Sequence, residues 1–397
     1  MKHPAQKLVY NSKYNALFLA VEDRIQKFDV GSQELLLEWL PSTSVQTQND
    51  FNNEPSKKKI KADQKLSDNI RTLTCTADGE YAVASTDESK SLLVFSSKTL
   101  QLLSTRPFPK RPSAIAVTRD SSTILLGDKF GDVYSVPVLA DTNATSTSAI
   151  SKLSESETES GGDIEPILGH VSMLVDLTVV EDKDGDTHII TSDRDEHIRV
   201  SKFPQAFIIE RFCFGHEQYV SQLLVPLWQP NILISGGGDD FLACWDWSTG
   251  ELLDKFDIKS RSFPSADEPS TQNVAVSGMW QVPELQMILV YNETAEKLFI
   301  LKLSGESKAN LLYINACEES LADIAATGTG GLIWISKASD VGDADVVRLY
   351  RLLEDGTMTP DVEISNCLSR NSSFTICSQE TVTAIRPVGL VRKHAEH

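Results

Sequence analysis

The chain has 397 residues, of which 41% are hydrophobic and 23% are charged, and these proportions exclude wholesale disorder. Its longest apolar run near the start is residues 16–21, too short for a signal peptide or a membrane span, so we expect an intracellular protein. The six cysteines show no C-x-x-C spacing, which predicts reduced thiols. A net charge of −19 repels a phosphate backbone, so the chain alone is not expected to bind nucleic acid well.

Short β-rich runs separated by turns recur along the chain. In chain order, these units span residues 8–30, 72–95, 113–136, 169–210, 215–256, 274–303 and 311–352. Two segments, 41–68 and 141–163, are too polar to bury a core and are predicted to be disordered loop insertions. Residues 382–385 are expected to pair with the N-terminal strands and close a ring, and residues 386–397 to form a C-terminal tail.

Two of these units repeat each other most clearly. Gly169-His170 opens one, and Gly215-His216 opens the next 46 residues later. Each continues with four short strand-like runs, and the second unit carries Trp245-Asp246 near its end. A G-H start and a W-D end resemble the blade of a WD-repeat protein. With about seven units, the sequence predicts one all-β domain over residues 1–397, a seven-bladed WD-repeat β-propeller.

The histidines His170 and His216 occupy the G-H position, where a propeller blade usually buries the imidazole. A buried imidazole needs hydrogen-bond partners on a neighbouring strand and in the following turn. The expected partners are Thr191 and Asp195 for the first histidine, and Ser235, Asp239 and Trp245 for the second. A metal or catalytic role is disfavoured because no H-x-H or H-x-x-E cluster exists.

Glycine-rich stretches are the other candidates for chemistry. Residues 327–331 superficially resemble a nucleotide-binding loop, but a strand-like run follows them where a helix is required. The same interpretation applies to the glycine-rich residues 235–238. Both are predicted to be β-turns. Because no nucleophile elbow, Walker loop, zinc spacing or cofactor motif is present, the sequence predicts a non-catalytic chain without a cofactor.

Charged residues gather in the middle of the chain. Residues 191–199 hold five charged side chains within seven positions, and Lys129 and Lys110-Arg111 lie in the preceding unit. Charges of both signs on neighbouring blades suit recognition of a protein partner, and a solvated rim is the alternative. The basic cluster 57–61 is a nuclear-import signal, a contact for an acidic surface or a solvated loop. We expect the protein in the nucleus, with the cytoplasm as a second compartment.

Several strings resemble one particular family. They are Lys110-Arg111-Pro112, residues 128–134, 165–174 and 190–198, Phe214-Gly215-His216, residues 237–240 with Trp245-Asp246-Trp247, and the terminal residues 392–397. This family is the WD-repeat, non-catalytic subunit of the eukaryotic tRNA (guanine-N7-)-methyltransferase, and the similarity is greatest to its fungal members.

The resemblance implies a heterodimer in which a separate catalytic subunit binds S-adenosylmethionine and methylates N7 of a guanine in the tRNA variable loop. The propeller would hold no cofactor and would stabilise that subunit. Positions matching the family's docking contacts are Lys129, Arg194, Glu196 and Arg199, with Lys110 and Arg111 as weaker candidates. We expect tRNA to bind mainly through the partner, and a direct contact with the propeller to be secondary.

Two other functions compete with this interpretation. A general WD-repeat scaffold, such as a substrate receptor of a ubiquitin ligase, predicts an appended adaptor segment, and none is visible in the sequence. A propeller hydrolase needs acid and base groups that converge at the channel mouth, and no motif indicates such a set. Purification of the protein with its bound partner would separate all three.

Overall fold

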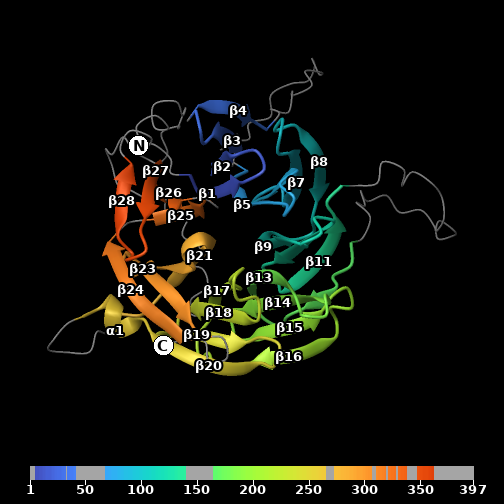
Figure 1. The fold of residues 1–397 in the computed structure, drawn as a ribbon. Helices are drawn as coiled ribbons and strands as arrows, with labels where there is room; N and C mark the ends of the chain where they lie inside the picture. The colour runs from blue at the N-terminus through green and yellow to red at the C-terminus, as the bar shows by residue number, and fades with distance from the viewer. Residues whose placement is uncertain are drawn as a thin grey trace, which may run out of the picture.

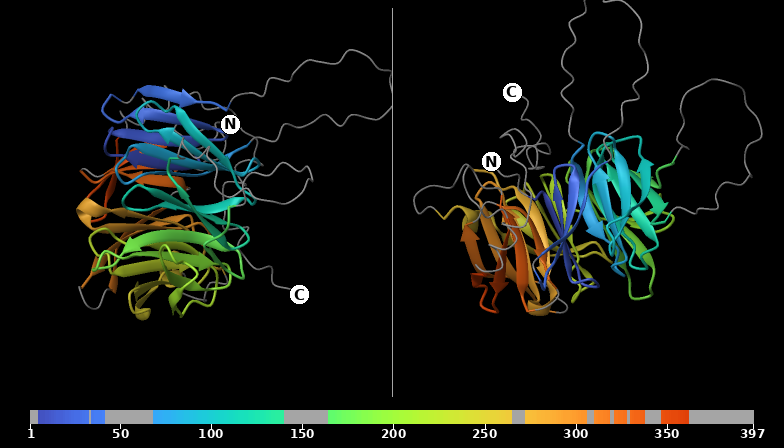
Figure 2. Two further views of the ribbon diagram at one scale, coloured as in Figure 1. Left: turned by 90° about the vertical axis from the view of Figure 1, so that its right-hand side faces the viewer. Right: turned by 90° about the horizontal axis from the view of Figure 1, so that it is seen from above.

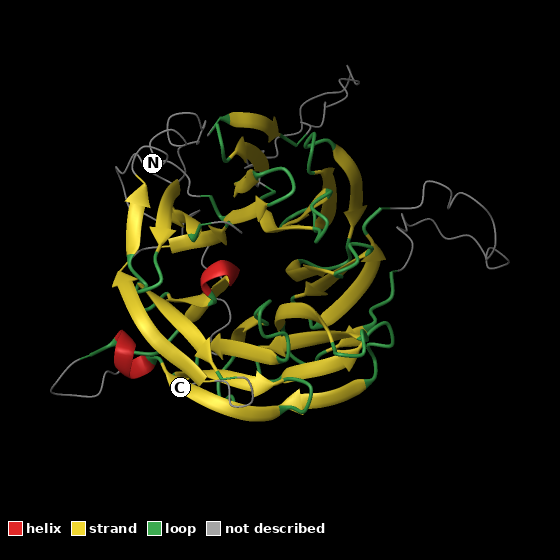
Figure 3. Cartoon of the chain, viewed as in Figure 1, coloured by secondary structure: helices red, strands yellow, loops and turns green. Residues whose placement is uncertain are grey.

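The structure is a computed structural model that describes residues 5–32, 34–41, 68–139, 164–264, 272–305, 310–318, 321–327, 330–337 and 347–361. Within these ranges the chain forms seven four-stranded antiparallel sheets, each built from strands that are consecutive in sequence. The sheets are arranged as blades around a ring (Figures 1 and 2), and Figure 3 shows that strands dominate. The prediction of a seven-bladed, all-β propeller is confirmed.

The bounds of the elements follow the chain. The strands of blades one to seven are β1 (Lys7–Asn11), β2 (Ala16–Val21), β3 (Arg24–Asp29) and β4 (Leu35–Trp39); β5 (Ile70–Cys75), β6 (Tyr81–Thr86), β7 (Ser91–Ser96) and β8 (Leu102–Pro107); β9 (Pro112–Val117), β10 (Thr123–Asp128), β11 (Asp132–Pro137) and β12 (Leu168–Gly169); β13 (Leu174–Glu181), β14 (Thr187–Asp193), β15 (Ile198–Lys202) and β16 (Ile209–Cys213); β17 (Val220–Leu224), β18 (Ile232–Gly237), β19 (Phe241–Asp246) and β20 (Glu251–Asp257); β21 (Val276–Val282), β22 (Met287–Asn292), β23 (Lys297–Ser304) and β24 (Asn310–Glu318); β25 (Leu321–Ala326), β26 (Leu332–Lys337), β27 (Val347–Leu352) and β28 (Met358–Asp361). Two short helical turns, α1 (Lys259–Ser262) and η1 (Pro283–Leu285), lie between strands.

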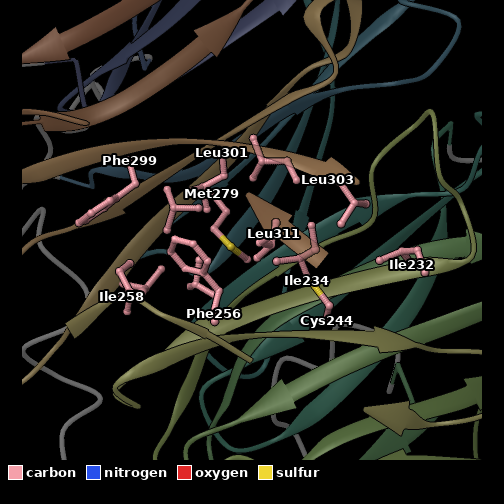
Figure 4. Close-up of a cluster of buried hydrophobic side chains, with 14 of the residues drawn as sticks. Ile232, Ile234, Cys244, Phe256, Ile258, Met279, Phe299, Leu301, Leu303 and Leu311 are labelled. Atoms are coloured by element: carbon pink, nitrogen blue, oxygen red, sulfur yellow. The ribbon is translucent and has the colours of Figure 1, made fainter. Parts of the chain in front are cut away.

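Burial explains the apolar patterns of the strands. The second strand of a blade is covered on both faces by neighbouring blades, so all six residues of β2 are buried and apolar. The outermost strand β8 alternates between half-buried and exposed residues, because one face looks to solvent. The hydrophobic core is therefore divided into clusters between adjacent blades. Figure 4 shows one of them, in which Ile234 and Phe256 of blade five pack with Met279 and Phe299 of blade six.

The innermost strands contact one another around the ring. The strand β1 of the first blade packs against β25 of the last blade, so the ring closes directly between these two blades. One side chain fastens this junction: the buried carboxylate of Asp323 accepts a hydrogen bond from the backbone N–H of Leu8, at 2.8 Å, and another from the indole N–H of Trp280, at 3.2 Å. A single carboxylate thus joins blades six, seven and one.

Strand direction divides the turns between two faces of the ring. In blade four, Leu174 at the start of β13 pairs with Asp193 at the end of β14. Residues 170–173 and 194–197 therefore lie on the same face, which we call the upper face together with the equivalent turns of the other blades. The turns at the opposite ends of these strands form the lower face.

Some expectations need correction or lie beyond the described ranges. Leu311 belongs to β24, the last strand of blade six, so blade seven begins at Leu321 and not at residue 311. The predicted closing strand at 382–385 and the tail 386–397 lie outside the described residues. The same holds for residues 42–67 and 140–163 of the two predicted insertions.

Candidate partner interface and the blade networks

Blade five holds the hydrogen-bond network predicted for its histidine. His216 is buried, with Nδ1 2.7 Å from the carboxylate of Asp239 and Nε2 2.7 Å from the hydroxyl of Ser235. The indole N–H of Trp245 donates to the same hydroxyl oxygen, at 2.8 Å. An ionised carboxylate only accepts, so Nδ1 donates to Asp239, and the hydroxyl proton of Ser235 is left to donate to Nε2. Each polar atom of the imidazole then has a hydrogen-bond partner within the blade.

Blade four repeats this arrangement with one correction. The Nε2 atom of His170 lies 2.7 Å from the hydroxyl of Thr191, as expected, but its Nδ1 lies 3.0 Å from the carboxylate of Asp193. The prediction of Asp195 as this partner is wrong. In both blades the aspartate follows the histidine by 23 residues. The backbone N–H of Asp195 itself donates to Asp193, at 2.9 Å, because the turn is wound around that carboxylate.

The candidate docking residues lie on neighbouring turns of the upper face. The backbone N–H of Lys129 donates to the carbonyl of Arg111, at 3.2 Å. Further along, the N–H of His170 donates to Gly131, at 2.9 Å, and the N–H of Arg194 donates to Met173, at 2.9 Å. These backbone contacts join blades three and four into one continuous surface, so the structure brings Lys110, Arg111, Lys129, Arg194 and Glu196 together. We call this surface the docking face.

Two lysines of the docking face share one aromatic ring. The ammonium groups of Lys110 and Lys129 lie 4.7 Å and 5.1 Å from the centre of the half-exposed Phe130 ring. A cation within about 6 Å of a ring face is attracted to it. Neither lysine makes an ion pair within the described residues, so both charges remain available to an incoming carboxylate.

Arg194 and Arg111 differ in how their charge is balanced. Arg194 is half-buried, its Nε atom donates no hydrogen bond, and its guanidinium makes no ion pair among the described residues. Arg111 is already paired, with Nη2 3.1 Å from Glu88 and Nε 3.9 Å from Asp87. The weaker ranking of Arg111 therefore has a structural basis. Glu196 lies in the same turn as Arg194 with a φ of 65°, a left-handed conformation that is uncommon for a glutamate.

The placement of Arg199 on a partner surface is wrong. Its side chain is buried, and its guanidinium donates to the hydroxyl of Ser201, at 2.9 Å, and to the backbone carbonyls of Gly169 and Ala206, at 3.1 Å and 2.8 Å. Burial lowers the pKa of this guanidinium. Arg199 joins blade four to the last strand of blade three, and its hydrogen-bonding groups are committed within the propeller.

Comparison with known proteins shows which family this propeller belongs to. The profile of the tRNA methyltransferase TRM82 WD40 domain matches residues 17–162 and 149–339. The chain belongs to this family. The tRNA (guanine-N(7)-)-methyltransferase non-catalytic subunit TRM82 of Kluyveromyces lactis is 29% identical over the full length of both chains. Its counterpart in Aspergillus clavatus is 34% identical over 72% of this chain and 68% of its own. These names confirm the prediction of a non-catalytic chain.

Solved structures support the fold of this TRM82-family chain. The solved structure of U3-55K aligns with a TM-score of 0.61 and 16% sequence identity, over 86% of this chain and 91% of its own. At this identity the similarity establishes the propeller alone. Among the described residues, no helix has the length and apolar character to cross a membrane, and no group of histidine, cysteine and acidic side chains is arranged to hold a metal ion.

Sequence reasoning missed the aspartates that organise the turns of this TRM82-family propeller. Asp128 accepts hydrogen bonds from the backbone N–H groups of Phe130, at 2.7 Å, and Asp132, at 3.2 Å. Asp193 does the same for residues 195 and 197, at 2.9 Å and 3.0 Å. The signal was available, because both aspartates open a turn at the end of the second strand of a blade. These carboxylates set the positions of Lys129 and Arg194.

Stability should depend on pH through Asp193. Burial raises the pKa of this carboxyl, but the hydrogen bonds from His170 and the backbone of His197 outweigh burial and hold the pKa below its ordinary value. A lowered pKa stabilises the fold above the unfolded-state pKa of about 4, and this stabilisation is lost as the pH falls through the folded-state value. We expect denaturant unfolding at pH 7 to give a larger free energy of unfolding for the wild type than for Asp193→Asn. This difference should shrink below pH 4. A difference that stays constant with pH would contradict this.

Proposed function

We propose that this propeller binds and stabilises the catalytic subunit of a tRNA (guanine-N7-)-methyltransferase, in a heterodimer required for N7-methylguanosine in the tRNA variable loop. The catalytic subunit would bring S-adenosylmethionine and most of the tRNA contacts. The net charge of −19 supports this division, because an acidic propeller needs a separate basic surface to attract tRNA. The names of the fungal relatives support membership of such a complex.

One observation carries the proposed contact surface. Arg194 holds a half-buried charge with no ion-pair partner in the described chain, and Lys110 and Lys129, on a neighbouring turn of the same face, have none there either. A partly desolvated charge without a partner is unfavourable, so the half-buried Arg194 is suited to a protein that supplies a carboxylate, and the exposed Lys110 and Lys129 add positive charge to the same face. Glu196 in the same turn would meet a cation of that protein.

Charge reversal at Arg194 tests the proposal. Removing one member of an interfacial charge pair costs about 2–5 kcal/mol, so Arg194→Glu should raise the Kd for the co-expressed catalytic subunit by at least about 30-fold. The propeller should stay folded, because the guanidinium makes no ion pair with any residue that the structure describes. Binding is measured by titration calorimetry, folding by thermal unfolding, and N7-methylguanosine in tRNA from cells that carry only the variant.

The matched control is Arg119→Glu. Arg119 is exposed on the lower face of blade three, in the turn between β9 and β10, where it lies 3.4 Å from Glu181. Its reversal should leave binding unchanged. Wild-type affinity in the Arg194 variant would remove the docking face from the proposal, and failure of the wild-type chain to bind the catalytic subunit would remove the function itself.

A further inference from the structure

Large apolar side chains are exposed on the docking face. Val171 is fully exposed, Phe214 is 68% exposed, and Phe130 is half-exposed between its two lysines. Val171 directly follows His170, whose imidazole is buried in the blade-four network, so the chain turns its next side chain out to solvent. The network needs the histidine, but nothing in it calls for an apolar residue at position 171. Exposed apolar groups gathered on one surface indicate an interaction site.

These side chains belong to one surface. The Phe130-Gly131 turn touches the loop that bears Val171 so closely that a Cβ on Gly131 would lie 2.5 Å from the carbonyl oxygen of His170. On the other side of that loop, Met173 accepts the hydrogen bond from Arg194.

Aromatic rings extend the surface toward blade five. The ring of His197, three residues after Arg194, contacts Phe212 edge-on, with 6.3 Å between the ring centres. Phe212 in turn stacks on Phe214, with 5.2 Å between the ring centres. The apolar groups thus follow the charged ones across blades three and four, which lie side by side around β11 and β16 in Figure 1.

The charges around the apolar groups define what can cover them. Lys110 and Lys129 lie over Phe130, and Arg194 is joined by its backbone N–H to Met173 in the loop that bears Val171; none of the three makes an ion pair among the described residues, on a chain whose net charge is strongly negative. A matching surface needs apolar side chains at its centre and carboxylates at its edge. A basic tRNA-binding surface of a methyltransferase cannot supply those carboxylates, so the matching surface must be a different part of that protein.

We infer that Val171 and Phe214, with Phe130, form the apolar centre of the docking face and receive an acidic amphipathic segment of the catalytic subunit. This inference rests on the proposed function and adds the chemistry of the partner's segment. Its apolar side chains would cover Val171 and Phe214, while its carboxylates would reach the two lysines and Arg194. The buried apolar area supplies affinity, and the charges supply orientation.

Substitutions of exposed residues test the inference without disturbing the core. Val171→Asp places a negative charge at the apolar centre, and Phe214→Ala removes a ring. We expect each to raise the Kd for the full-length catalytic subunit at least tenfold, with unchanged thermal unfolding. The matched control is Phe207→Ala, because Phe207 is 72% exposed on the lower face, in the turn between β15 and β16. Its effect should stay within twofold.

Salt separates the apolar contribution from the charged one. Raising the salt concentration from about 0.15 to about 0.5 M screens exposed charges. The loss of affinity for the catalytic subunit caused by Arg194→Glu should therefore shrink, while the loss caused by Phe214→Ala should persist. Wild-type binding by Val171→Asp and Phe214→Ala, alongside lost binding by Arg194→Glu, would overturn the inference and leave the proposed function in place. Binding of transfer RNA to the free propeller that Val171→Asp reduces would also overturn it, because the surface would then serve RNA.

Discussion

Replacing Asp323 by alanine is expected to open the ring between its first and last blades. The carboxylate of Asp323 is buried at the innermost strand β25, where it accepts the backbone N–H of Leu8 in β1 and the indole N–H of Trp280 in β21. Alanine leaves two donors without an acceptor at the closing junction. An unsatisfied buried donor costs about 1–3 kcal/mol, so for the two donors we expect a loss of about 2–6 kcal/mol in the free energy of unfolding.

Urea unfolding measures this loss, and amide hydrogen exchange locates it. Exchange should accelerate first in β1 and β25, because these strands form the junction. Asp323→Asn retains one acceptor oxygen and should lose less stability than alanine. The control is Asp355→Ala in the same blade, since Asp355 is exposed and its carboxylate accepts hydrogen bonds within its own turn, among them one from the N–H of Thr357. An Asp323→Ala variant with the wild-type urea midpoint would show that the junction does not depend on this carboxylate.

His216→Ala should cost a similar amount of stability by a different route. The substitution leaves a cavity and removes the group that satisfies both Asp239 and Ser235 within the core of blade five. The remaining carboxylate is then buried with fewer hydrogen bonds. Removing one member of a buried polar network and leaving its partners unsatisfied costs about 3–5 kcal/mol. Denaturant unfolding followed by tryptophan fluorescence would report it, because Trp245 belongs to the network.

Two further histidine variants define the mechanism of this loss. His216→Asn places an amide near the position of Nδ1 and should recover part of the stability. His197→Ala removes a histidine whose side chain is 43% exposed at the docking face, and should cost less than about 1 kcal/mol. Equal losses for His197→Ala and His216→Ala would contradict a special role for the buried network.

The sequence alone determined the features that depend on local spacing. The G-H and W-D signals and the apolar runs indicate seven blades because every blade repeats the same short-range pattern of strands and turns. The partners of His216 followed from the same pattern, since they occur at fixed distances within one blade. The TRM82 family was visible in the strings around residues 110–250 for the same reason.

Tertiary structure decided which charged residues remain available to a partner. The sequence predicted Arg199 as a docking residue, but its guanidinium donates a hydrogen bond to the backbone carbonyl of Gly169, 30 residues away in the preceding blade. Arg111 is balanced by Glu88, 23 residues away, whereas Arg194 is left without a partner in the described chain. The ring itself is closed by Asp323 and Leu8, which lie 315 residues apart. Contacts between blades form only when the ring assembles, so no local pattern encodes them.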